Sequence, residues 1–231
     1  MNLDAPLYDL QRIKIFLSYS TKDKHTAGTI KYQLVKLGYD VFLAHHDLEP
    51  SQVWVEEILR NLDNCDIFLP FLTENCFNSF WVNQEIGIGF IKNKLIMPFT
   101  INRIPWGFIS HIQAYCLDAS SATNLYNDIQ NACSKIEKIM TSKDPEKMRD
   151  TLIFALDKSG SYETSNKIAI SLMKCGLISA DQVNEIIRIF LKNDQVNQAY
   201  EGRNLILDLF TNYYDAIDSE FEEILRDNWD F

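Results

Sequence analysis

Short apolar runs alternate with amphipathic stretches along the first 140 residues. The apolar runs are rich in strand-forming residues, and the run 66–72 is almost free of polar positions. The stretches between the runs repeat apolar residues at helical spacing. Near-continuous apolar strands separated by helices are typical of a parallel sheet covered on both faces, so the pattern predicts an α/β fold. The expected strands are 13–18, 40–44, 66–72, 95–101 and 113–118, and the expected helices are 26–37, 54–62, 81–91 and 122–140.

The sequence after residue 140 shows helical spacing without strand-like alternation. The polar stretch Thr141–Pro145 contains an Asp-Pro pair of the kind that begins a helix, so we expect a first domain 1–140 and an all-α domain 141–231. The first domain carries 12 basic and 15 acidic residues, and the second carries 10 and 17. We expect the second domain to serve oligomerisation or regulation, with simple stabilisation of the first domain as the alternative. Its expected helices are 146–156, 165–175, 180–191 and 204–214, followed by an acidic end, 215–231, whose apolar residues pack.

Charge and hydropathy exclude several classes of partner. The 231 residues include 22 Lys+Arg and 32 Asp+Glu, a net charge of -10, which opposes binding to the phosphate backbone of nucleic acids. No window approaches the roughly 20 apolar residues of a membrane helix. The first residues, MNLDAPLYDLQ, are acidic where a signal peptide would be basic and then apolar. We therefore expect a cytoplasmic protein that binds neither nucleic acid nor membrane.

The cysteines and the common catalytic motifs narrow the chemistry further. Five widely spaced cysteines without a CxxC pair suggest neither a disulfide framework nor a zinc site, and buried thiols are the simplest interpretation. The sequence contains no GxGxxG, GxxxxGK[ST], GxSxG or HExxH. The usual Rossmann, P-loop, hydrolase-elbow and zincin chemistries therefore lack their residues.

The segment 79–87 is the most informative place to look for a site. A sheet of this kind binds ligands outside the carboxyl ends of its strands, and this segment opens a helix just after a strand. Trp81 and Glu85 lie one turn apart on the same helix face, with Ser79 available as the cap. A carboxylate beside an indole could hold a ribose hydroxyl while the ring covers the sugar or base. The alternative is a surface glutamate and a tryptophan that packs under a loop.

Three segments together resemble the TIR (Toll/interleukin-1 receptor) domain in order and spacing. They are Ile15–Asp23 (IFLSYSTKD), Gly38–Phe42 (GYDVF) and Trp81–Gly87 (WVNQEIG), which resemble the first strand and loop, the second strand and the WxxxE helix of the family. The resemblance covers about residues 11–140 and looks most like the stand-alone bacterial type. It implies a flavodoxin-like fold with five parallel strands.

Many members of the family cleave NAD at the bond between nicotinamide and ribose, and the resemblance implies this activity here. The family's catalytic glutamate falls on Glu85 and its accompanying tryptophan on Trp81. NAD would be the substrate, with no cofactor and no metal. The nicotinamide of NAD is a cationic pyridinium and leaves as a neutral molecule, so no general acid is required. One carboxylate can therefore suffice, to orient the ribose and to stabilise the developing positive charge. The products would be nicotinamide and either ADP-ribose or a cyclic isomer.

Two loops would complete the pocket that the resemblance implies. Ser18, Tyr19 and Ser20 follow the first strand, where the family's nicotinamide and ribose pocket begins, although such residues can also serve only a turn. His46 and Asp47 lie where the family has its BB loop, which mediates contacts between TIR domains. Adjacent histidines at 45 and 46 point apart and lack a third ligand at standard spacing, so we expect contacts at the substrate's edge, or solvated side chains, in place of a metal site.

The leading hypothesis is an NAD nucleosidase, with possible cyclase activity, that acts in bacterial antiviral defence by NAD depletion or nucleotide signalling. Unregulated activity would drain the cell's NAD, so we expect gating by self-association of TIR domains, with an activator or effector binding the helical domain. One alternative is a non-enzymatic TIR scaffold in which Glu85 is an ordinary surface acid. Another is a nucleoside deoxyribosyltransferase, which also uses a flavodoxin-like sheet and one glutamate.

Overall fold

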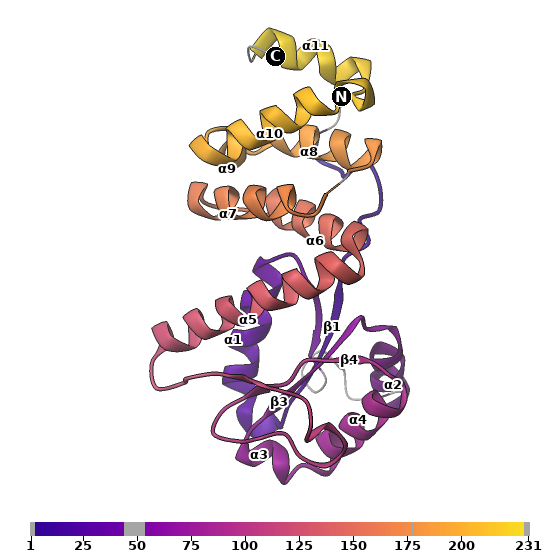
Figure 1. Ribbon diagram of the computed structural model, residues 1–231, viewed down its shortest axis with the longest axis vertical. Helices are drawn as coiled ribbons and strands as arrows, with labels where there is room; N and C mark the ends of the chain where they lie inside the picture. Colours follow the sequence, from indigo (N-terminus) through magenta and orange to yellow (C-terminus); the bar gives the residue numbers. More distant parts are fainter. Residues whose placement is uncertain (1–2, 44–53, 177, 229–231) are drawn as a thin grey trace. The chain divides into compact units, whose positions relative to one another are not determined.

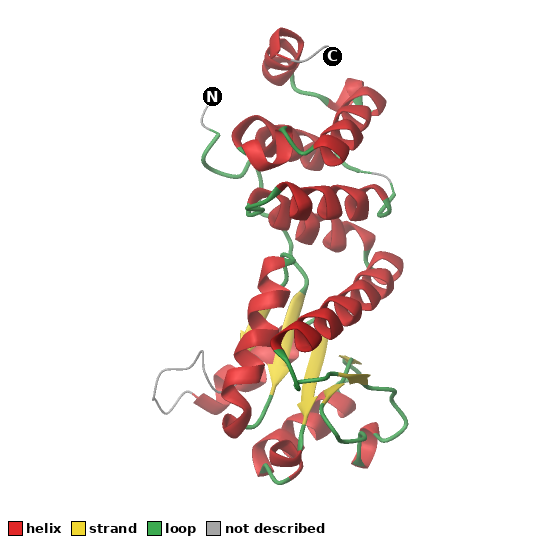
Figure 2. Ribbon diagram, turned by 90° about the vertical axis from the view of Figure 1, so that its left-hand side faces the viewer, coloured by secondary structure: helices red, strands yellow, loops and turns green. Residues whose placement is uncertain are grey.

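The computed structural model describes residues 3–43, 54–176 and 178–228, and the chain divides into two compact units. The first, the α/β unit, comprises Ile13–Val35 and Tyr39–Ile136. The second, the helical unit, combines the segment that ends at Arg12, the turn Lys36–Gly38 and the chain from Glu137 onward. Figure 1 shows the strands in the first unit, and Figure 2 shows helices and loops in the described part of the second.

The α/β unit is built on a parallel sheet with the flavodoxin-like order β2-β1-β3-β5-β6, in which β4 also pairs with β3. The five predicted strands correspond to these positions, but the fourth is divided into two short strands. Pro98 lies between the two and has no N–H to donate to a neighbouring strand, which explains the interruption. The strands are β1 (Lys14–Ser18), β2 (Asp40–Leu43), β3 (Ile67–Leu72), β4 (Leu95–Ile96), β5 (Phe99–Thr100) and β6 (Tyr115–Cys116).

Helices lie on both sides of this sheet. α2 and α4 share one side, because their buried residues form a single cluster with strand residues Phe16 and Phe68. Figure 1 shows α1 and α5 on the other side. On α2, Ile58 and Leu62 are buried, whereas Val55 and Leu59 are exposed. The helices are α1 (Lys24–Lys36), α2 (Trp54–Asn64), α3 (Glu74–Phe77), α4 (Phe80–Ile91) and α5 (Ala122–Lys143), with short 3-10 turns η1 (Thr21–Asp23) and η2 (Gly107–Ile109).

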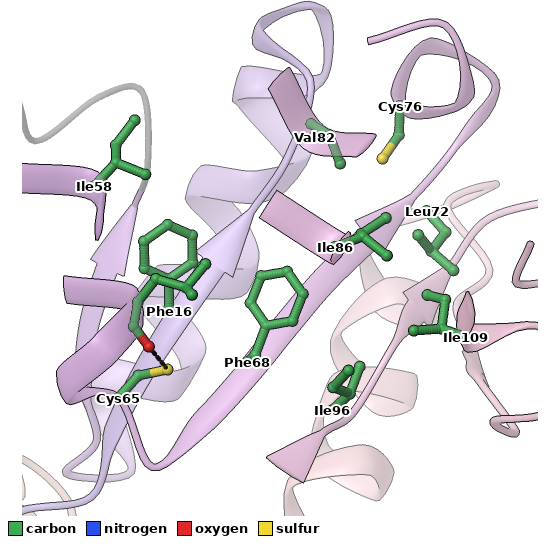
Figure 3. Close-up of a cluster of buried hydrophobic side chains, with 11 residues drawn as sticks. Phe16, Ile58, Cys65, Phe68, Leu72, Cys76, Val82, Ile86, Ile96 and Ile109 are labelled. Atoms are coloured by element: carbon green, nitrogen blue, oxygen red, sulfur yellow. Dashed lines mark hydrogen bonds between the residues drawn. The ribbon is translucent and has the colours of Figure 1, made fainter. Parts of the chain in front are cut away.

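The cluster between the sheet and α4 holds that helix close to the strands (Figure 3). Phe68 of β3 is fully buried, and its ring centroid lies 5.8 Å from that of Phe16. Val82 and Ile86 point from α4 toward the same core. Burying each such side chain contributes about 1.5–3 kcal/mol. Gly89 belongs to the same stripe, and a Cβ built on it would lie 2.7 Å from the Phe68 ring. The absence of a side chain at Gly89 therefore permits the close approach of α4 to β3.

The helical unit is centred on α8, whose residues from Gln182 to Phe190 are all buried. A capping box at Ser179 and Gln182 begins this helix, in agreement with the sequence around it. The unit's helices are α6 (Pro145–Asp157), α7 (Tyr162–Met173), α8 (Ala180–Lys192), α9 (Asp194–Asn197), α10 (Tyr200–Asn212) and α11 (Ser219–Asn228), with a 3-10 turn η3 (Tyr214–Ala216).

The N-terminal segment belongs to the helical unit, which differs from the expected division into 1–140 and 141–231. Leu7 donates its backbone N–H to the buried carboxylate of Glu185 at 2.8 Å, and the Tyr8 hydroxyl donates to Asp150 at 2.6 Å. These contacts join residues far apart in the sequence, which local patterning does not reveal. The expected boundary near residue 140 also falls inside α5, which continues through Thr141 to Lys143.

The cysteines are also only partly as expected. Cys65, Cys76, Cys133 and Cys175 are buried free thiols, whereas Cys116 is exposed. Cys116 lies on β6, at the end of the strand order, where the strand has a neighbour on one side only. Its position at the sheet edge accounts for its exposure.

Two glycines of α4 provide a matched test of this packing. We expect Gly89→Ala to lower the free energy of unfolding by about 1–3 kcal/mol, because the added methyl group would overlap the Phe68 ring. Gly87→Ala, where a Cβ would meet nothing within 4 Å, should be neutral or stabilising by up to ~1 kcal/mol, because alanine favours a helix over glycine. Urea unfolding of both variants measures the difference. Equal midpoints would contradict the close contact between α4 and β3.

Candidate active site

The candidate site lies where the strand order reverses, at the carboxyl ends of β1 and β3. These strands are neighbours, but the connections that follow them lead toward opposite edges of the sheet. Ligands of doubly wound sheets bind at this point, because the loops diverge there and leave a crevice. Ser18 ends β1, and Thr73 follows the last residue of β3.

Helix α4 delivers a carboxylate to this place. Ser79 caps the helix by accepting a hydrogen bond from the Val82 N–H, as the sequence predicts. The inward stripe of the helix consists of Val82, Glu85, Ile86 and Gly89. Glu85 therefore turns inward because it shares a helix face with residues that pack on the sheet.

Glu85 is buried, with only 2% of its surface exposed. The Ser18 hydroxyl donates a hydrogen bond to Glu85 Oε2. Glu85 Oε1 has no hydrogen-bond partner among the described residues. Burial removes water from the charged form and raises the pKa of Glu85 to about 7, while the hydrogen bond from Ser18 acts in the opposite direction. The site thus contains a carboxyl group whose pKa lies near neutral pH and one of whose oxygens is buried without a hydrogen-bond partner among the described residues.

Ser18 reaches Glu85 because of the alternation of side chains along β1. Phe16 belongs to the cluster on the α4 side of the sheet, and Ser18 lies two residues later, on the same side. The sequence placed Ser18 at the strand end but did not pair it with Glu85. Their separation of 67 residues explains why local motifs could not do so.

A second carboxylate joins the loop after β1 to the loop after β3. Asp23 accepts hydrogen bonds from Thr73 Oγ1 at 2.5 Å and from Asn75 Nδ2 at 2.7 Å. Thr73 also caps α3 by accepting from the Cys76 N–H at 3.1 Å. The contact fixes the loop after β1 to the loop after β3. Asp23 and Thr73 were not among the expected site residues. Asp23 nevertheless ends the segment that resembles the first strand and loop of the family, and Thr73 directly follows β3.

The other predicted site residues differ in their surroundings. Trp81 lies one turn before Glu85 and is 39% exposed, so its indole is partly accessible from solvent. Tyr19 and Ser20 are buried next to Ser18, and the Ser20 carbonyl accepts the Asp23 N–H at 2.7 Å. His46 and Asp47 lie outside the described residues. Contacts of all these side chains with a substrate stay a prediction.

The segment after β5 contacts α4 through Trp106. Trp106 donates its Nε1–H to Asn83 Oδ1 of α4 at 2.8 Å, and its ring packs edge-on against Phe77 at 5.2 Å between centroids. The segment around η2 is therefore attached to α4, the helix that carries Glu85.

In the part of the chain that the structure describes, no three His, Cys, Asp or Glu residues gather into a group that could hold a metal ion. Within the same ranges, none of the helices combines the length and the apolar character that a membrane span requires.

The burial of Glu85 makes stability depend on pH. The folded protein holds the proton of Glu85 up to a pKa of about 7, whereas the ordinary value is 4.5. The stability that the protonated form contributes is therefore complete below pH 4.5 and is lost as the pH rises through about 7. The side chain in Glu85→Gln is uncharged at every pH. We therefore expect the free energy of unfolding of this variant to exceed that of the native protein by at most ~3 kcal/mol at pH 8 and by little at pH 4.5.

Urea unfolding at both pH values measures this difference. Glu56→Gln is the matched control, because it removes an exposed carboxylate from α2 of the same unit. A Glu85→Gln effect that is the same at both pH values, as for the control, would contradict the raised pKa.

The family model of the TIR domain matches residues 15–132, which is half of the chain. A search of curated proteins found no match. The matched range contains most of β1, all of β3 and α4 with Glu85. The chain belongs to the TIR domain family.

Proposed function

We propose that the protein is an NAD nucleosidase in which Glu85 acts on the bond between nicotinamide and ribose. The observation that carries the proposal is the buried carboxylate of Glu85, which has one oxygen without a partner among the described residues. An acid on an ordinary protein surface would be solvated, as the scaffold alternative expects. Burying a carboxyl group without satisfying both oxygens is destabilising, and such an arrangement is typical of functional sites.

The reaction needs few protein groups. The bond between the ribose anomeric carbon and the pyridinium nitrogen breaks, and its electron pair passes to nicotinamide, which leaves neutral. Water then adds to the anomeric carbon and releases a proton, which gives ADP-ribose. In a cyclase, a nitrogen of the adenine would attack in place of water. The positive charge that develops on the ribose is stabilised by a nearby carboxylate, whose effect is strong where water is excluded.

Glu85 and Ser18 divide the work in this proposal. Ser18 binds Oε2 and fixes the orientation of the carboxylate, so it is a positioning residue. Oε1 is then free to accept hydrogen bonds from the 2' and 3' hydroxyls of the ribose and to face the anomeric carbon. Trp81, one turn away and partly exposed, would cover the sugar or the nicotinamide ring.

The charge of the substrate also suits this carboxyl group. Glu85 must be ionised to stabilise a cation, and its pKa of about 7 leaves it partly protonated at neutral pH. A pyridinium ring beside the carboxylate favours the ionised form and lowers that pKa. At NAD concentrations well below saturation, the rate of nicotinamide release should therefore rise as the pH increases through about 7.

The biological setting follows from the family resemblance. We propose a cytoplasmic role in antiviral defence, by NAD depletion or by a cyclic ADP-ribose signal. The helical unit would recognise an activator or effector, and TIR self-association would switch the activity on.

The direct test is nicotinamide release from NAD by the purified full-length protein at high concentration. We expect Glu85→Gln to reduce the rate by a factor of about a hundred or more, because it removes charge stabilisation from the transition state. Chromatography of the products separates ADP-ribose from a cyclic isomer. Glu56→Gln, the exposed control, should retain the native rate.

Three results would contradict the proposal. Equal turnover by the native protein and Glu85→Gln would remove Glu85 from the mechanism. A native protein that neither releases nicotinamide nor binds NAD would favour the non-enzymatic scaffold. Activity on deoxynucleosides in place of NAD would favour the deoxyribosyltransferase.

A further inference from the structure

The outward side of α4 is an uncharged apolar surface. Glu85 is the only charged residue of this twelve-residue helix, and it points inward. Directly opposite the inward stripe lie four residues, which we call the α4 seam: Phe80, Gln84, Gly87 and Ile91. Phe80 is 86% exposed and Ile91 is 75% exposed. A contiguous exposed apolar patch, unlike a single exposed residue, is typical of an interaction surface.

Aromatic residues extend this surface along one flank of the seam. Phe77 packs on Trp106 near the beginning of α4. Phe90 stacks on Phe108 near its end, with the centroids 5.1 Å apart and the rings 10° from parallel. Phe77, Phe90 and Phe108 are themselves exposed. The patch therefore runs the full length of the helix and has a ring pair at each end.

The spacing of the seam is self-complementary. Its steps of four, three and four residues are those of a helix-pairing stripe, and they read the same in both directions. In an antiparallel pair related by a two-fold axis, Phe80 of one copy would face Ile91 of the other, and Gln84 would face Gly87. Gly87 has open space outside it, since a Cβ there would meet nothing within 4 Å. The missing side chain would let the two helix backbones approach closely.

An uncharged surface suits a second copy of this chain. Each chain has a net charge of -10, so two copies repel each other, and a seam without charged residues adds no local repulsion to that of the whole chains. Ion pairs lie near opposite ends of the helix, Glu74–Arg103 before it and Asp63–Lys92 after it. In an antiparallel pair, the Glu74–Arg103 ion pair of one copy would lie near the Asp63–Lys92 ion pair of the other. Each end would then offer charges of both signs to its neighbour.

We propose that the α4 seam is a two-fold contact between two copies of this chain. Such a contact is isologous, because the same residues serve both partners. It goes beyond NAD cleavage and does not depend on it, since a scaffold could use the same surface. Glu85 and the seam would then occupy opposite sides of one helix.

The first test measures mass by light scattering during size-exclusion chromatography over a range of concentrations. We expect the native chain to form dimers, and we expect Gly87→Arg and Phe80→Glu each to weaken association by at least ~10-fold. Gly87→Arg should leave the fold intact, because its side chain enters open space, and circular dichroism with thermal unfolding checks this. Tyr200→Glu, which changes an equally exposed aromatic residue of the helical unit, should associate as the native chain does.

The second test determines the orientation of the pair. In a Cys116→Ser background, we expect Phe80→Cys with Ile91→Cys to give disulfide-linked dimers under mild oxidation. The two positions lie about 16 Å apart along one helix, too far for a bond within one chain. Either single cysteine variant should cross-link poorly, because an antiparallel pair separates identical positions.

Three results would overturn the proposal. The first is a native chain that stays monomeric at every concentration. The second is a dimer that folded Gly87→Arg and Phe80→Glu leave unchanged. The third is cross-linking of the single variants as efficient as that of the double variant.

Discussion

The burial of Glu85 on the inner face of α4 is the constraint on which the candidate site depends. The inward stripe of α4 packs its apolar residues on β3, and Gly89 lets the helix approach the Phe68 ring. Because Glu85 lies within that stripe, the packing that stabilises the unit also withdraws a carboxyl group from water. The apolar contacts offset the unfavourable burial, and the raised pKa is its consequence. The core and the site are therefore parts of one arrangement.

The surroundings of Glu85 explain how a single carboxylate could be sufficient. Ser18 holds one oxygen from the end of β1, and the Asp23–Thr73 hydrogen bond fixes the two loops that border the crevice. The strand order brings these loops together, since β1 and β3 are neighbours. In our proposals the inner side of α4 would serve the chemistry and its outer side would serve assembly. A shift of this helix on forming a dimer would therefore reach the carboxylate directly.

Much of the fold followed from the sequence, and particular long-range contacts did not. The alternation of apolar runs predicted the parallel sheet, and Ser79 predicted the cap at the start of α4. The pairing of Ser18 with Glu85 and of Asp23 with Thr73 joins residues 50 or more positions apart, which no local period encodes. The N-terminal segment was assigned to the first domain for the same reason, because Glu185 and Asp150 bind it from the far end of the sequence. Pro98 could have indicated the interruption of the fourth strand.

The most direct measurement is a crystal structure of the protein with a non-cleavable NAD analogue in which carbon replaces the ring oxygen of the nicotinamide ribose. The account predicts that the ribose hydroxyls lie within hydrogen-bond distance of Glu85 Oε1, with the anomeric carbon facing this oxygen at about 3–3.5 Å. An analogue bound with its ribose away from Glu85 would contradict the central role of that carboxylate.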